Sequence, residues 1–252
     1  MRQFLKKIAY QMLKPVGFDV PRKGMRTSMY GMLDQLIELG FKPETVIDVG
    51  VAYGTFELYE KFPTTNFLLV EPLIEYEKNL KAICQKYHAQ YIMAGAGAQA
   101  GNITINVHPQ LYGSSTLNES EGSLADGVPR EIPLVVLDDV CREKNLKAPY
   151  LLKIDVQGAE LSVLDGCGQM LEDTEVIILE VSLFQFFVGG PQLYDVVSYM
   201  KERGFVTYDI FGGYIRPLDG ALAQVDMVFV KENGLFRKSH FFATPQQRKQ
   251  LV

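Results

Sequence analysis

The chain has 252 residues, of which 47% are hydrophobic, and this is enough to bury a sizeable core within one domain. Its net charge of -5 and pI of about 5.3 disfavour a nucleic-acid-binding protein, because such proteins carry a domain-wide excess of basic residues. The three cysteines form no C-x-x-C pair and the three histidines are scattered, so the sequence predicts no zinc site and favours the reducing cytoplasm.

Residues 1–44 have the pattern of a basic, amphipathic helical arm. Apolar side chains recur there at helical spacing, while seven Lys and Arg residues between Arg2 and Arg26 are opposed by Asp19 alone. Such an arm can rest peripherally on an anionic membrane surface or hold an anionic substrate carrier, or it can pack on the domain or on the second subunit of a homodimer. Because no apolar run is long enough to span a bilayer or to serve as a secretory signal, we expect a cytoplasmic protein without a transmembrane segment.

A glycine turn follows the first apolar strand, residues 45–49, and runs from Gly50 to Gly54. The second strand, residues 67–70, ends on Glu71-Pro72. A turn of this kind lets backbone N–H groups approach a ligand, and an acid about 20 residues further on can accept hydrogen bonds from a ribose. The pair predicts an adenosine cofactor bound by Gly50, Gly54, Glu71 and Pro72.

The residues around this turn indicate which cofactor it is. A dinucleotide site needs a glycine where Ala52 stands, and Asp48 would repel a pyrophosphate, so an NAD-type oxidoreductase is disfavoured. Asp48 would instead suit the amino group and sulfonium of S-adenosylmethionine (SAM), while Glu71 could hold both ribose hydroxyls. The alternative is that Asp48 and Glu71 only cap a tight turn and a helix.

The third strand, residues 90–94, leads into small residues that include Ala96 and Gly97. They would let a flat adenine lie against the backbone, or they form only a flexible turn. A strand at residues 102–107 and a polar segment at residues 110–131 follow. So long a loop in a compact domain is usually functional or mobile.

Two further strands, residues 150–155 and 175–180, end on Asp155 and Glu180. The carboxyl ends of neighbouring parallel strands meet where the sheet order reverses, so we expect Asp48, Glu71, Asp155 and Glu180 to rim one crevice. Lys153 should project to the same face as Asp155 and neutralise Glu180, either in catalysis or only to fix the strand registry.

Strands alternate with helical stretches through most of the chain, which predicts a doubly wound α/β domain with a mostly parallel sheet and helices on both faces. After a helix at residues 192–203, strands at 205–210 and 225–230 should form an antiparallel hairpin at the sheet edge. We therefore divide the chain into the helical arm 1–44, a domain 45–232 and a tail 233–252 that shows no motif.

Seven short segments together resemble the FkbM-type SAM-dependent methyltransferases, over about residues 27 to 232. They are Val46-Ile-Asp-Val-Gly50, Val70-Glu-Pro72, Gly113-Ser-Ser-Thr-Leu117, Leu137-Asp-Asp139, Leu151-Leu-Lys-Ile-Asp-Val-Gln-Gly-Ala-Glu160, Leu179-Glu-Val-Ser182 and Gln224-Val-Asp-Met-Val-Phe229. The resemblance implies a Rossmann-like class I methyltransferase sheet. Ala52 departs from the family, which usually carries Asn at this place.

The resemblance also implies transfer of a methyl group from SAM to a hydroxyl of a sugar, a glycan or a secondary metabolite. The hydroxyl must lose its proton, for which Asp155 is best placed and Glu180 next, with Lys153 beside them and His108 as a weaker candidate. Asp155 is also a predicted ligand of the cofactor. Asp155 and Glu180 could supply oxygen ligands to Mg²⁺, although we assign no residue to a metal. A degenerate SAM-binding module without turnover is the alternative that Ala52 leaves open.

The acceptor should be bound by residues outside the cofactor half. The candidates come from the polar loop, from the turn after the fourth strand and from the segment after the fifth strand. They are Tyr112, Ser114, Ser115, Gln157, Glu160 and Phe187.

Overall fold

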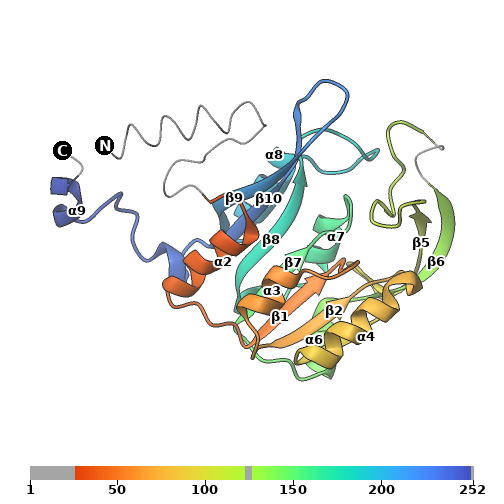
Figure 1. Cartoon of the computed structure of the whole chain (residues 1–252), viewed down its shortest axis with the longest axis horizontal. Coiled ribbons are helices and arrows are strands. Elements are labelled where there is room, and N and C mark those ends of the chain that lie inside the picture. The colour runs from red at the N-terminus through yellow and green to blue at the C-terminus, as the bar shows by residue number, and fades with distance from the viewer. Residues whose placement is uncertain (1–25, 123–126, 251–252) are drawn as a thin grey trace, which may run out of the picture.

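The computed structural model describes residues 26–122 and 127–250, which are built around one seven-stranded sheet (Figure 1). The strand order is β3-β2-β1-β7-β8-β10-β9. The first five strands in this order are parallel, and β10 runs antiparallel to both β8 and β9. Their bounds are β3 Ala89–Ile92, β2 Asn66–Val70, β1 Thr45–Val49, β7 Tyr150–Ile154, β8 Thr174–Ser182, β10 Leu222–Lys231 and β9 Phe205–Ile215. The doubly wound α/β fold and its antiparallel edge hairpin are confirmed.

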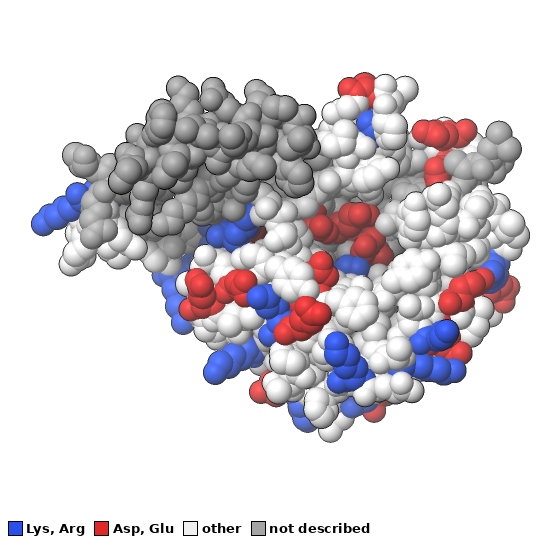
Figure 2. Space-filling model, viewed as in Figure 1, with Lys and Arg blue, Asp and Glu red and all other residues white. Residues whose placement is uncertain are grey.

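The sheet order reverses at β1, which has β2 on one side and β7 on the other. A ligand crevice forms at such a switch point, beyond the carboxyl ends of the strands. Figure 2 shows a hollow in this face of the molecule with acidic side chains gathered in it, near the place where β7 and α7 (Glu160–Asp165) lie in Figure 1.

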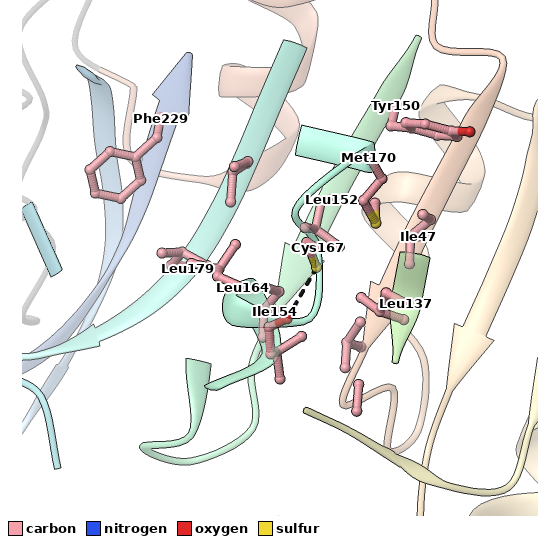
Figure 3. Close-up of a cluster of buried hydrophobic side chains, with 14 of the residues drawn as sticks. Ile47, Leu137, Tyr150, Leu152, Ile154, Leu164, Cys167, Met170, Leu179 and Phe229 are labelled. Carbon is pink, nitrogen blue, oxygen red and sulfur yellow. Dashed lines mark hydrogen bonds between the residues drawn. The ribbon is translucent and has the colours of Figure 1, made fainter. Parts of the chain in front are cut away.

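Helices cover both faces of the sheet and close two hydrophobic cores. One core holds Ile47 and Leu152 with apolar residues of α6 (Leu137–Glu143), α7 and α8 (Leu193–Glu202), and Figure 3 shows part of it. The other holds Val46 and Leu151 with residues of α2 (Met29–Glu38), α3 (Phe56–Lys61) and α4 (Glu77–Lys86). Successive residues of a strand thus enter opposite cores, and this is why β1 and β7 are buried at every position.

A second, three-stranded sheet stands beside the main one, with the order β4-β6-β5. It consists of β4 Gly95–Ala96, β5 Gly101–Val107 and β6 Val128–Val135. The expected polar loop therefore ends earlier than residue 131, because β5 supplies an antiparallel partner along the whole of β6. The antiparallel hairpin at the sheet edge is likewise longer than expected, and both of its strands extend to the turn at residues 216–221.

The remaining elements are short. They are the 3-10 helices η2 Ile74–Tyr76, η3 Met170–Asp173 and η4 Leu235–Arg237, and the helix α9 Pro245–Gln250. In the part of the chain that the structure describes, no helix is long and apolar enough to cross a membrane.

Most of the expected N-terminal arm lies outside the described residues. Its last part forms α2, which begins after Ser28, whose hydroxyl oxygen accepts a hydrogen bond from the N–H of Gly31 at 3.4 Å. Met32, Leu33 and Leu36 of this helix are fully buried in the same core as Val46. The division into an arm, a domain and a tail stays a prediction.

We expect Leu152→Ala to destabilise the fold by about 2–5 kcal/mol, because the side chain is fully buried in the central strand and its removal leaves a cavity. Urea unfolding followed by circular dichroism measures this. Val128→Ala is the control, since Val128 is 70% exposed and should change the free energy of unfolding by less than about 0.5 kcal/mol. Equal effects of the two substitutions would contradict this account of the core.

Candidate active site

A cavity of about 250 Å³ opens at the carboxyl ends of β1, β2, β7 and β8. Its wall is completed by the small sheet and by the loop after β5. The predicted site residues that line it are Gly50, Glu71, Pro72, Ala96, Tyr112, Ser114, Asp155, Gln157 and Glu180. The fold thus brings together cofactor, catalytic and acceptor candidates that lie up to 130 positions apart in the chain.

Glu71 ties the glycine turn to the end of β2. Its carboxylate is 4% exposed and accepts hydrogen bonds from the N–H of Ala52 and the N–H of Leu73, both at 2.9 Å. Burial raises the pKa of Glu71, and the two N–H donors oppose this effect. Because a carboxylate oxygen can accept more than one hydrogen bond, both oxygens of Glu71 can still receive hydroxyl groups of a ligand.

Asp48 lies beneath the crevice and not on its rim. Its side chain is fully buried and outside the cavity lining, with the hydroxyl of Tyr59 donating to Oδ2 at 2.6 Å and the ammonium of Lys153 at 3.6 Å from Oδ1. The expected direct contact with a cationic ligand is therefore corrected: Asp48 holds the residues that shape the turn. The alternation of side chains along β1 is the reason, since it turns Asp48 toward α3.

Lys153 is buried between β1 and β7. Its Nζ donates to the carbonyl of Gly50 at 3.1 Å and to Asp155 Oδ2 at 3.4 Å. Burial disfavours the ammonium, but the charges of Asp155 and Asp48 outweigh this and raise the pKa of Lys153 above its usual value. Lys153 forms its ion pairs with Asp48 and Asp155, and the charge of Glu180 is a smaller contribution to its raised pKa. Neutralisation of Glu180 by Lys153 stays a prediction. A charged lysine outside the cavity lining positions its neighbours and accepts no proton.

Glu180 is held by two side-chain amides. Gln157 Nε2 donates to Glu180 Oε2 at 3.0 Å and to Asp155 Oδ1 at 2.8 Å, and Gln224 Nε2 donates to the same Oε2 at 3.0 Å. Burial, followed by the charges of Asp155 and Asp226, raises the pKa of Glu180 to about 8. Gln157 reaches both carboxylates because its backbone is left-handed, with φ of 56°.

A further carboxylate, Asp226, lies near Asp155 and Glu180, and we did not predict it as a site residue from the sequence. It lies on β10 directly opposite Glu180 in the strand register. Burial and the charge of Asp155 raise its pKa to about 6. One signal in the sequence could have found it, since Gln224 and Asp226 are polar at alternate positions of an otherwise apolar strand.

Three of the predicted acceptor residues support the turn at Gln157 and Gly158, which we call the Gln157 turn, and lie outside the cavity lining. They are Glu160, Ser115 and Phe187. Glu160 accepts hydrogen bonds from the N–H of Val156 and of Gly158, both at 3.1 Å, and burial raises its pKa to about 7. Ser115 Oγ donates to the carbonyl of Gln157 at 2.6 Å. Phe187 is 7% exposed, and its ring packs so close to Gly158 that an added Cβ there would lie 3.2 Å from it.

Gly54 and Gly97 are also absent from the cavity lining. An added Cβ at Gly54 would lie 2.9 Å from Ile83, and the N–H of Gly97 donates to the carbonyl of Val135 at 3.0 Å. Both residues therefore shape the backbone around the cavity. Of the two aromatic acceptor candidates, Tyr112 lines the cavity and Phe187 does not.

The cavity suits an adenosine cofactor. Tyr76, which the sequence did not single out, lines it and is 2% exposed, and its hydroxyl has no hydrogen-bond partner among the described residues. Burial raises the pKa of Tyr76 to about 12, so the hydroxyl keeps its proton and remains a donor. Ala94, Ala96 and Ile132 also line the cavity. A nucleoside matches this combination, because it joins polar hydroxyls to a flat apolar ring.

The Methyltransferase FkbM domain model matches residues 48–207. The chain belongs to the FkbM methyltransferase family. Two fungal proteins are similar to it: "Methyltransferase 1" of Beauveria bassiana (strain ARSEF 2860) is 28% identical over 183 residues, which are 64% of this chain and 72% of that protein. "Methyltransferase sdnD" of Sordaria araneosa is 29% identical over 156 residues, which are 49% and 60% of the two chains.

Two solved structures are similar to this chain. A putative O-methyltransferase from Klebsiella pneumoniae is 11% identical with a TM-score of 0.46, over 84% of each chain. A TehB-like SAM-dependent methyltransferase from Corynebacterium glutamicum is 10% identical with a TM-score of 0.39, over 91% of this chain and 98% of that one. The match to the family model and the two fungal methyltransferases confirm the predicted SAM-dependent methyltransferase class of this FkbM protein. Magnesium gains no support, since the described residues hold no group of three or more His, Cys, Asp or Glu able to bind a metal ion.

We expect Glu71→Gln to weaken the binding of S-adenosylhomocysteine by about 100-fold, because a neutral amide loses charge-assisted hydrogen bonds to the turn and to a ligand hydroxyl. Calorimetric titration measures the Kd. Glu75→Gln is the matched control, since Glu75 pairs with Arg130 at the surface two residues before the helix α4 begins. An unchanged Kd in a Glu71→Gln protein that melts like the native one would refute the assigned role.

Glu180 should make the protein less stable as the pH rises. Its folded pKa of about 8 lies above the ordinary value of 4.5, so between these limits the folded state binds more protons than the unfolded state. We therefore expect the Tm to fall between pH 5 and pH 8, and to fall less in Glu180→Gln. Scanning calorimetry across this range tests it, with Glu143→Gln at the surface as a control that should keep the native slope.

Proposed function

We propose that this FkbM-family protein is an O-methyltransferase that acts on a hydroxyl of a small molecule or glycan, either a sugar or a secondary metabolite. When bound, SAM supplies an electrophilic methyl group on a sulfonium. The observation that carries the proposal is the pair of carboxylates Asp155 and Glu180 in the cavity wall, linked by Gln157. Methylation of a hydroxyl needs a nearby group that can take its proton, and this pair supplies one.

At the cofactor end, Glu71 would accept hydrogen bonds from the ribose hydroxyls. The unpartnered hydroxyl of Tyr76 would donate to a polar atom of the nucleoside, and Ala94 and Ala96 would pack against its base. Ala52 adds no side-chain hydrogen bond here, but its backbone N–H fixes Glu71. The departure from the family residue at this position thus leaves the carboxylate in place.

Glu180 is the stronger candidate for the general base. Both amide hydrogen bonds to it end on Oε2, so an acceptor hydroxyl would meet Oε1. Asp155 already accepts from Gln157 on Oδ1 and from Lys153 on Oδ2. A base is most effective when its pKa lies near the working pH, and the raised pKa of Glu180 meets this condition. Asp155 would then hold Gln157 and, through it, Glu180.

The acceptor would enter past Tyr112, which is 61% exposed at the mouth of the cavity, and Ser114. A tyrosine ring beside polar groups suits a sugar ring, whose faces are apolar and whose rim carries hydroxyls. We assign Mg²⁺ no role in this reaction, and its concentration is varied only in the assay. Cytoplasmic location, a homodimer, the absence of nucleic-acid substrates and membrane contact through the N-terminal arm remain predictions.

The test is transfer of radiolabelled methyl from SAM to a panel of sugars, oligosaccharides and polyketide alcohols, with and without Mg²⁺. For the native protein kcat/KM should rise with pH, reach half of its maximum at about pH 8 and level off above it, because the deprotonated form of Glu180 is the active one. Glu180→Gln should lower kcat by about 10²–10⁴-fold and remove this pH dependence. Asp155→Asn should keep a pH dependence with its midpoint at lower pH, because the charge of Asp155 helps to raise the pKa of Glu180.

Three other results would point elsewhere. Native-like turnover by Glu180→Gln would exclude Glu180 as the base. Binding of S-adenosylhomocysteine without turnover of any acceptor would favour a degenerate SAM-binding module. Binding of reduced nicotinamide cofactors in its place would favour an oxidoreductase.

A further inference from the structure

The C-terminal segment, residues 233–250, takes no part in the site, and its composition differs from that of the rest of the chain. Residues 233–252 contain four Lys and Arg residues and no Asp or Glu, in a protein whose net charge is -5. Phe241 and Phe242 follow one another there and are 88% and 79% exposed. Neighbouring large apolar side chains left in water mark an interaction surface.

Aromatic and basic groups are presented together on this segment. The guanidinium of Arg248 lies 5.5 Å from the ring centroid of Phe242. Between them, the N–H of Thr244 donates to Gln247 Oε1 at 2.9 Å and the N–H of Gln247 donates to Thr244 Oγ1 at 3.2 Å. These reciprocal bonds fix the start of α9 and thereby the position of Arg248 relative to the aromatic pair.

Two arginines, one near each end of the domain, contact the same edge strand, β9. Arg237 donates through its guanidinium to the carbonyl of Thr207 at 3.1 Å, and Arg26 forms an ion pair with Asp209. Arg26 and Arg237 thus contact β9 two residues apart, at the end of the molecule where α9 lies (Figure 1). Residues 1–26 hold seven Lys and Arg against one Asp, so two basic sequences are joined to one edge of an otherwise acidic protein.

We propose that residues 233–249 form a docking surface for an anionic lipid bilayer. Phe241 and Phe242 insert between the headgroups, and the exposed cations Lys238, Arg248 and Lys249 contact their negative charges. Rings of this size gain by leaving water at the interface, and each nearby basic side chain adds electrostatic attraction. A flat lipid surface meets only this basic edge, whereas a long polyanion such as RNA would also meet the acidic remainder of the protein.

This inference goes beyond the proposed methyl transfer and does not depend on it. The docking surface shares no residue with the cavity, and α9 lies at the opposite end of the molecule from the small sheet that completes the cavity wall (Figure 1). It gives the protein access to acceptors that are held at a membrane.

The test is co-sedimentation of the purified full chain with vesicles of phosphatidylcholine alone and of phosphatidylcholine with phosphatidylglycerol, at low and at high salt. The native protein should bind the anionic vesicles, bind the neutral ones weakly, and detach as salt rises. Arg248→Gln/Lys249→Gln should lower the partition coefficient by about five-fold per charge. Phe241→Ala/Phe242→Ala should lower it by roughly tenfold or more.

Control variants keep the test specific. Lys78→Gln/Lys81→Gln removes two charges from α4, and Val128→Ala removes exposed apolar surface from β6. Both should bind the anionic vesicles like the native protein. All four variants lie at exposed positions and should melt like the native protein.

Native-like vesicle binding by both tail variants would overturn the proposal, and so would failure of the native chain to bind anionic vesicles. A gel shift with single-stranded oligouridylate completes the test. Binding of that RNA without vesicle binding, if it is lost on the tail substitutions, would replace the lipid by nucleic acid.

Discussion

The buried ammonium of Lys153 is the interaction on which the geometry of the site depends. It lies between Asp48, Asp155 and the carbonyl of Gly50, and so joins β1, β7 and the glycine turn. An unpaired charge at this depth would cost several kcal/mol. Removal of Lys153 would therefore leave the buried carboxylate of Asp48 without a countercharge. Asp48 and Lys153 are also direct neighbours in the parallel register, so their pairing fixes the two central strands at the point where the sheet order reverses.

Two further contacts fix the glycine turn at residues 50–54. An added Cβ at Gly50 would lie 1.8 Å from the carbonyl oxygen of Asp155, so only glycine allows the turn to pack on the end of β7. Glu71 reaches back from β2 to the N–H of Ala52. Three neighbouring strands therefore determine the backbone conformation of the turn beside the cavity.

The carboxylates in and beside the cavity wall carry less negative charge than their number suggests. Asp155, Glu180 and Asp226 face one another across β7, β8 and β10, and the single ammonium of Lys153 cannot balance all of them. Protons are retained on the most buried members as a result. The same arrangement that costs stability at higher pH gives the site a group able to accept a proton near neutrality, which is the chemistry that methylation of a hydroxyl requires.

The sequence by itself determined the elements whose signal is local. The strand, turn and acid at residues 45–71, the run through Glu160 and the alternation of strands and helices sufficed for the doubly wound fold, the family and the cofactor class. Each of these signals lies within one short segment, where periodicity and turn residues act directly. They also led to Glu71, Asp155 and Glu180, since strand ends can be found without knowing what lies beside them.

Only the tertiary structure decided which of these side chains face the cavity. Asp48, Glu160, Ser115 and Phe187 looked like ligand contacts, yet packing from α3 and from the Gln157 turn buries them as supports. Asp226 and Tyr76 joined the site through the pairing of β10 with β8 and the position of η2. Contacts between residues far apart in the chain set the burial and the neighbouring charges of each group, and a linear sequence carries no local signal for either.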